Sequence, residues 1–241
     1  MNEILQTHQI YGYNSNEQLL MLLITALTNF GGIPVTVYLY RMERFFEAFI
    51  SCFTVLTSFM YHASDSLDTS KLFLTELQWH QLDNIGSITC FMIVFVHLMD
   101  NKDWKLDLQL YLGCFTIAIF TQVKDPWNLF YTLVPIFMGV LVFLLTLIFR
   151  KRKPEINTLA LGKSIFFVMI AAFCFGRGLN EFQDYLRISH GFWHLNIYIA
   201  NFYFWQIRLP LGVEITWSNF WKKQMYQKSL LETNGLKEEE V

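Results

Sequence analysis

Long apolar stretches recur along this chain and constrain its fold more than any other feature. Several of them run for about 20 residues, enough for a helix to cross a bilayer core of roughly 30 Å. Of the 241 residues, 54% are hydrophobic and 16% are charged, whereas charged residues make up about a quarter of soluble domains. A lipid-exposed backbone must satisfy its polar groups internally, which favours helices. The sequence therefore predicts an all-α, polytopic membrane protein.

The apolar stretches divide into seven predicted spans joined by short polar links. Pro34 lies inside the first span, where we expect a kink. The spans form one membrane domain, residues 18–209, between an extracytoplasmic N-terminal segment, 1–17, and a C-terminal tail, 210–241. The seven predicted spans are 18–40, 45–61, 79–98, 106–122, 129–149, 159–179 and 190–209.

Basic residues are distributed unevenly between the two sides of these spans. Fourteen of the 18 Lys and Arg residues fall on the first, third and fifth links and the tail, with Lys163 counted in the fifth link and Arg208 in the tail. Because basic links are retained in the cytoplasm, this predicts an extracytoplasmic N-terminus and a cytoplasmic C-terminus, in the plasma membrane or a secretory-pathway membrane. The tail combines Trp217, Phe220 and Trp221 with Lys222 and Lys223, which predicts a helix at the cytoplasmic interface.

Two histidine-containing motifs share the spacing of one helical turn. His190 and His194 are four residues apart, so a helix places both imidazoles on one face, and Ser58 precedes His62 by the same interval. The charge-derived topology used no histidine, yet it brings His62 and the start of the seventh span to the same membrane face. Three neutral imidazoles would occupy three positions of a tetrahedral zinc ion and leave the fourth for water.

Asp83 near the start of the third span is predicted to lie at the same depth. Its carboxylate would accept a proton from the water on zinc or orient a ligand, and Ser58 would donate to the oxyanion that develops. Two simpler interpretations stay open. Asp83 would also stabilise the dipole of its helix, and Ser58 would also bond to the carbonyl of residue 54.

Three further polar residues are weaker candidates for this site. His80 is either a substitute ligand or an interfacial residue, and Asp65 either orients His62 or is solvated in a loop. His97 falls at the inner end of the third span and is expected to be structural.

Taken together, Ser58, His62, Asp83, His190 and His194 resemble the CREST superfamily of seven-helix metal hydrolases. That group includes alkaline ceramidases, adiponectin and progestin receptors, and the transmembrane-protein-8 and myomaker branch. The resemblance covers essentially the whole membrane core. It implies a zinc site in the outer part of the bundle and a role directed at membrane lipid.

Two local stretches look most like the transmembrane-protein-8 and myomaker branch. One is the run from Tyr61 to Asp65, although Ser64 stands where that branch typically has cysteine. The tail contains no cysteine, so the tail acylation associated with myomaker is not carried over. The other stretch precedes the last histidine pair and contains Arg177, Glu181, Asp184 and Tyr185.

These features support two hypotheses about function. The first is a zinc-dependent hydrolase of a lipid amide or ester, and the second is a non-enzymatic receptor or membrane-remodelling scaffold with a structural zinc. A transporter is disfavoured because no charged relay lies at mid-membrane and no inverted repeat is visible. The formal net charge is −2 and no basic stripe is present, so a nucleic-acid partner is excluded, and no soluble partner is identifiable.

Overall fold

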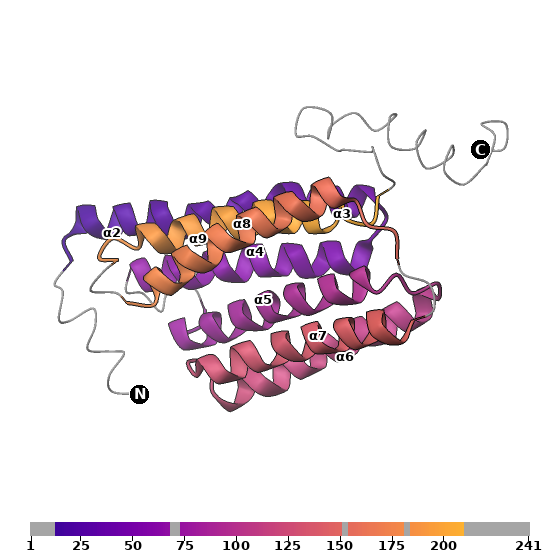
Figure 1. Ribbon diagram of the computed structural model, residues 1–241. Coiled ribbons are helices and arrows are strands. Elements are labelled where there is room, and N and C mark those ends of the chain that lie inside the picture. The colour runs from indigo at the N-terminus through magenta and orange to yellow at the C-terminus, as the bar shows by residue number, and fades with distance from the viewer. Residues whose placement is uncertain (1–12, 68–72, 151–153, 181–183, 210–241) are drawn as a thin grey trace.

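In a computed structural model the chain is a bundle of helices that lie along a common axis (Figure 1). The structure describes residues 13–67, 73–150, 154–180 and 184–209. These residues contain no β-strand, which confirms the all-α prediction. The elements are α2 (Ser15–Met21), the π-helical η1 (Leu22–Ala26), the 3-10 helix η2 (Leu27–Gly32), α3 (Ile33–Arg41), α4 (Phe45–Ser66), α5 (Glu76–Leu98), α6 (Trp104–Lys124), α7 (Leu129–Phe149), α8 (Thr158–Gly178) and α9 (Ile188–Phe204).

Six helical stretches are long and apolar enough to cross a membrane, as expected of a multi-pass membrane protein. The first is continuous from α2 to α3. The helix α9 has 17 residues, which correspond to about 26 Å at ~1.5 Å per residue. In the most apolar 18-residue stretch of each helix, 56% is buried in α4 and in α5, but only 6% in α7. The apolar surface of α7 therefore faces outward, where a bilayer would cover it.

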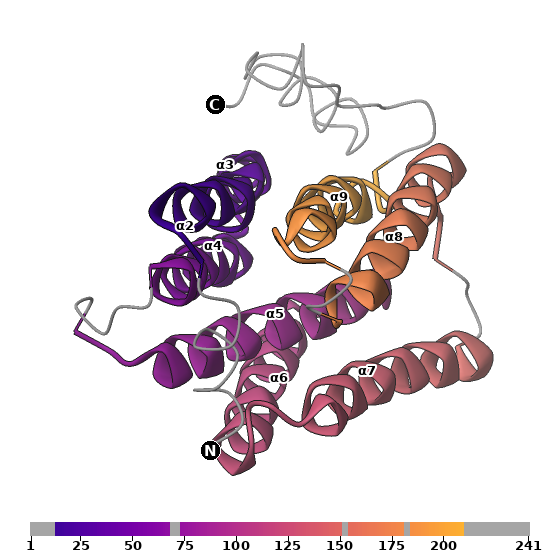
Figure 2. The same cartoon turned by 90° about the vertical axis from the view of Figure 1, so that its left-hand side faces the viewer.

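The helix α5 lies at the centre of the bundle, with α4 packed along it (Figure 2). On one side α5 packs against α6 and α7, while α8 packs along α9 on another. The helix α9 also contacts η1, η2 and α3, so the last described helix lies beside the first helical stretch. Side chains from several of these helices form the core, among them Val35, Leu39, Ile50, Ile88, Ile93 and Phe202.

Polar residues set the starts of several helices. At α2 the Asn14 side chain accepts backbone N–H bonds from Asn16 and Glu17, and Glu17 accepts the N–H of Asn14 in return. Thr75 and Gln78 make the same reciprocal cap at the start of α5. Such caps satisfy backbone donors that have no partner within the helix. These boundaries are therefore specified by local sequence.

The predicted end of the second span, at residue 61, is too early. The helix α4 continues through the polar run and ends at Ser66. His62, Ser64 and Ser66 are each only 1% exposed, because neighbouring helices cover this end of α4. Polar residues ended the predicted span because they were expected to face water, whereas here they face the interior of the bundle.

The first span departs from regular α-helix over a longer stretch than the expected kink. The backbone is π-helical and then 3-10 in η1 and η2, and Pro34 lies in the first turn of α3. Proline has no N–H to bond the carbonyl one turn earlier, so one α-helical hydrogen bond is missing where η2 meets α3. The irregular stretch packs against α9 and α4.

Other boundaries differ from the predicted spans by a few residues. The third and fourth helices begin earlier, at Glu76 and Trp104, and α9 ends at Phe204 rather than at residue 209. Part of the predicted N-terminal segment, 15–17, belongs to α2. Residues 1–12 and the tail with its predicted interfacial helix, 210–241, lie outside the described residues.

Candidate metal centre

Three histidines meet at one end of the bundle, which we call the site end. There α4 and α8 end and α5 and α9 begin, at the left in Figure 1. His62 lies in the second-last turn of α4, and His190 and His194 lie in the first two turns of α9. His62 and His194 are buried and His190 is half-buried. The predicted spacing therefore holds on α9, where one helical face presents both imidazoles to α4.

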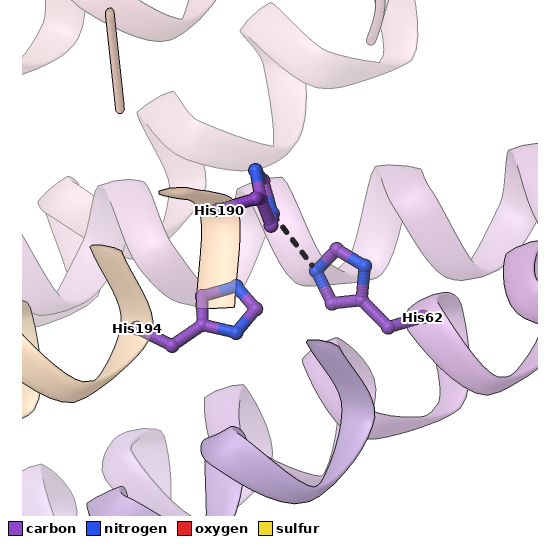
Figure 3. Close-up of side chains that lie close together, drawn as sticks. All are labelled: His62, His190 and His194. Carbon is purple, nitrogen blue, oxygen red and sulfur yellow. Dashed lines mark hydrogen bonds between the residues drawn. The ribbon is translucent and has the colours of Figure 1, made fainter. Parts of the chain in front are cut away.

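The three imidazole rings converge on a common point (Figure 3). Their centroids are 4.7–4.8 Å apart in every pairing, and one nitrogen from each ring lies within 4.8 Å of the others. His62 Nε2 and His190 Nε2 are separated by 3.3 Å. Two nitrogens that each lie 2.0–2.1 Å from a tetrahedral zinc are also about 3.3 Å apart. The three imidazoles could therefore hold one metal ion, and the His62–His190 pair has the spacing of two nitrogen ligands on such an ion.

A second contact fixes the tautomer of His194. Its Nδ1 lies 3.1 Å from the carbonyl oxygen of Thr25 and 3.1 Å from the hydroxyl of Thr28. Because a carbonyl can only accept, Nδ1 carries the proton and donates it to Thr25. The lone pair of His194 is then on Nε2, and a partner of this kind commonly orients a metal-binding imidazole.

The irregular first span supplies this carbonyl. In η1 the normal α-helical bonding is interrupted, and the Thr25 carbonyl also accepts from Thr28 and Asn29 side chains. Short π-helical segments often occur at functional sites because they redirect backbone groups in this way. The distortion of the first span therefore has a consequence at the metal centre.

Replacing Gly191 with alanine is expected to loosen the histidine cluster. An added Cβ would lie 2.6 Å from both Cγ2 and the backbone oxygen of Ile24, so α9 or η1 must move. Overpacking of this kind costs about 1–3 kcal/mol, and the shift would separate His190 from His62. The temperature of thermal unfolding should fall. The zinc affinity, measured by competition with a chelator, should fall as well. Gly162→Ala is the matched control because nothing lies within 4 Å of its Cβ position; equal behaviour of the two variants would contradict this prediction.

Ser58 and Asp83 lie together one turn deeper in the bundle than His62. The Ser58 hydroxyl is within hydrogen-bonding reach of the Asp83 carboxylate, and Ser87 Oγ lies 3.4 Å from Asp83 Oδ1. The group of mutually close ligand atoms consists of the three histidines and does not include Asp83. Asp83 therefore lies outside this group.

His80 is also at the site end but belongs to an aromatic stack. Its ring lies 3.8 Å from that of Trp127 and 4.7 Å from that of Tyr61, measured between centroids. Tyr61 in turn packs against His62 at 4.5 Å. His80 is not part of the histidine cluster, which favours its packing role over that of a ligand.

The remaining two polar candidates lie apart from the cluster. His62 Nδ1 has no hydrogen-bond partner among the described residues, so Asp65 does not orient this imidazole; its carboxylate interacts electrostatically with His80 instead. His97 lies at the opposite end of the bundle, where its Nδ1 is 2.6 Å from Arg44 and its ring packs on Trp205.

Sequence reasoning missed the groups that surround the histidines. The carbonyl of Thr25 gives no signal in sequence, because any residue has a backbone oxygen and only the fold brings this one to His194. Arg187 is buried and acts electrostatically on all three imidazoles. The sequence contains one signal for Arg187: it is a basic residue in the short connector before the seventh predicted span, three positions before His190.

Residues 17–195 match a family described as a protein of unknown function, DUF3522. The chain belongs to this family. The DUF3522 match includes Ser58, His62, Asp83, His190 and His194, so every residue of the proposed site falls inside it. No curated protein matches the chain. Because the DUF3522 description assigns no activity, a functional proposal depends on the geometry of the site.

Proposed function

We propose that this protein is an integral-membrane zinc hydrolase that cleaves an amide or ester bond of a membrane lipid. The observation that carries the proposal is the convergence of His62, His190 and His194. Asp83, which pairs with Ser58 one turn deeper, would supply the acid. Three neutral nitrogen ligands are the arrangement of a catalytic zinc site, in which the fourth coordination position stays open. The resemblance to the CREST superfamily points to the same chemistry.

The chain's own groups can carry the proton transfers of hydrolysis. A zinc ion held by the three imidazoles would polarise the substrate carbonyl and lower the pKa of water at the open position to about 7. Asp83 takes a proton from the attacking water and returns it to the leaving nitrogen or oxygen as the C–N or C–O bond breaks. Ser58 keeps the Asp83 carboxylate aimed at the site by hydrogen bonding.

A lipid substrate is supported by the surroundings of the site. His62 and His194 are buried inside a bundle whose outer helices expose apolar side chains, for example Phe137 on α7 and Met169 on α8. A molecule that already resides in the bilayer would reach such a site between helices without crossing water. We therefore propose a membrane lipid as the substrate.

The orientation of the bundle is part of this proposal. The excess of Lys and Arg on the links at the opposite end supports an extracytoplasmic site end and N-terminus, with the C-terminus in the cytoplasm. This arrangement suits the plasma membrane or a membrane of the secretory pathway.

Removal of the metal provides the test of the hydrolase. The detergent-purified full chain is assayed with a ceramide-type amide and a phospholipid ester, before and after treatment with a strong chelator. We expect cleavage of one of these lipid classes, its loss on chelation and its return when zinc is restored. Full zinc occupancy with no turnover of either class would contradict the proposal.

One observation favours a second candidate function, a scaffold with a structural zinc. The close group contains only histidines from α4 and α9, so a metal there would also tie these two helices together. A scaffold predicts that chelation lowers the thermal stability and that Asp83→Asn leaves function intact. The hydrolase predicts that Asp83→Asn strongly lowers turnover.

A further inference from the structure

We propose that Asp184 is a positioning residue that fixes His190 in the metal centre; this inference rests on the proposed zinc site. Asp184 lies in the connector before α9 and is 5% exposed. Its Oδ1 accepts the backbone N–H of Ser189 at 2.8 Å, and its Oδ2 accepts the backbone N–H of His190 at 3.0 Å. Both carboxylate oxygens are thus used on the first turn of the helix that carries two of the ligands.

The hydrogen bonds of the Asp184 carboxylate hold the turn before α9 in its conformation. Arg187 has a φ of 56°, in the left-handed region that residues other than glycine rarely adopt. Its N–H donates to the Asp184 carbonyl at 2.7 Å, and Gly191 donates back to the Arg187 carbonyl at 2.9 Å. The Arg187 guanidinium also donates to the Gly178 carbonyl at 3.1 Å, at the end of α8. The turn therefore joins the end of α8 to the start of α9.

The end of α8 restrains His190 from a second side. A Cβ added at Gly178 would lie 3.3 Å from His190 Cβ and 3.4 Å from both its Cα and its N. The backbone of His190 is thus held between the Asp184 carboxylate and Gly178. Since Cα and Cβ are fixed, the imidazole is directed toward His62, whose Nε2 is 3.3 Å from His190 Nε2.

This role differs from that of an ordinary helix cap. Asp103 also caps a helix, since its Oδ1 accepts the N–H of Lys105 at 2.9 Å at the start of α6. That cap has no metal-binding residue in its first turn, whereas Asp184 bonds to the N–H of His190 itself. Loss of partners that orient a metal ligand typically weakens binding by roughly 10–100-fold, while loss of a cap alone lowers stability.

The test compares Asp184→Asn with the matched control Asp103→Asn in the full chain. Asparagine retains one acceptor oxygen, so only one of the two N–H bonds at Asp184 can be kept. Zn²⁺ affinity is measured by chelator competition, and Co²⁺ is used as a probe because its visible absorption depends on ligand geometry. We expect Asp184→Asn to bind Zn²⁺ about 10–100-fold more weakly and to change the Co²⁺ spectrum. Asp103→Asn should keep the wild-type affinity and spectrum.

A second variant keeps the test informative if Asp184→Asn does not fold. Gly178→Ala presses on His190 from the other side and should change the Co²⁺ spectrum as well. A wild-type spectrum and affinity in a folded Asp184→Asn or Gly178→Ala protein would overturn the positioning role. Absence of Zn²⁺ and Co²⁺ binding in the wild-type protein would instead overturn the proposed metal centre.

Discussion

Replacing His62 with alanine is expected to abolish zinc binding by the purified protein. His62 is the ligand from α4, and its Nε2 is 3.3 Å from that of His190. Without it only the pair on α9 remains, and two imidazoles rarely hold zinc in a protein site. Metal analysis should show the zinc content fall from about one ion per chain to near zero.

His80→Ala is the matched control for this change. It removes the same side chain from the same end of the bundle, but His80 stacks on Trp127 and is not part of the histidine cluster. Its zinc content should stay at the wild-type level. Retention of zinc by His62→Ala, or equal loss in both variants, would show that the metal is bound elsewhere.

Asp83→Asn is expected to lower lipid turnover by about 10²–10⁴-fold with the zinc content unchanged, as for loss of a general base. Asparagine has nearly the same shape and can still accept a hydrogen bond from Ser58, but it cannot take a proton from water. Because Asp83 lies outside the group of mutually close ligand atoms, the histidines should keep their arrangement. The measurement is the initial rate of cleavage of the lipid class identified in the zinc-restoration assay, with metal analysis of the same sample.

Asp65→Asn makes the same chemical change at the site end and serves as the control. Asp65 interacts with His80 rather than with the Nδ1 of His62, so its replacement should leave turnover close to that of the wild type. Full turnover in Asp83→Asn would remove Asp83 from the mechanism. It would also favour the scaffold in which zinc joins α4 to α9.

The distinction between the hydrolase and the scaffold depends on how far Asp83 lies from the histidines along the bundle axis. Ser58 precedes His62 by four residues, which is about 6 Å along a helix axis. Asp83 is at the level of Ser58, and a water at the open zinc position would have to lie between the acid and the three imidazoles. The Asp83 variant tests this arrangement more directly than metal content does.

Several features of this protein follow from its sequence alone. Apolar stretches long enough to cross a bilayer predict the helices, since backbone hydrogen bonding in an apolar environment leaves few alternatives. The caps at Asn14 and Thr75 are specified by neighbours three residues away. The spacing of His190 and His194 predicts one helical face, because the period of the helix is fixed by its backbone.

Only the tertiary structure decided which other groups these local features contact. It extends α4 to Ser66, because burial among other helices lets polar residues stay helical. It brings the Thr25 carbonyl to His194 and the Asp184 carboxylate to the N–H of His190, contacts that depend on backbone groups and on an irregular turn. Such contacts leave no pattern of residue types in the sequence. The sequence determined the helices and the ligand spacing through local bonding, whereas the site required the packing of both α9 and α4 against the first span.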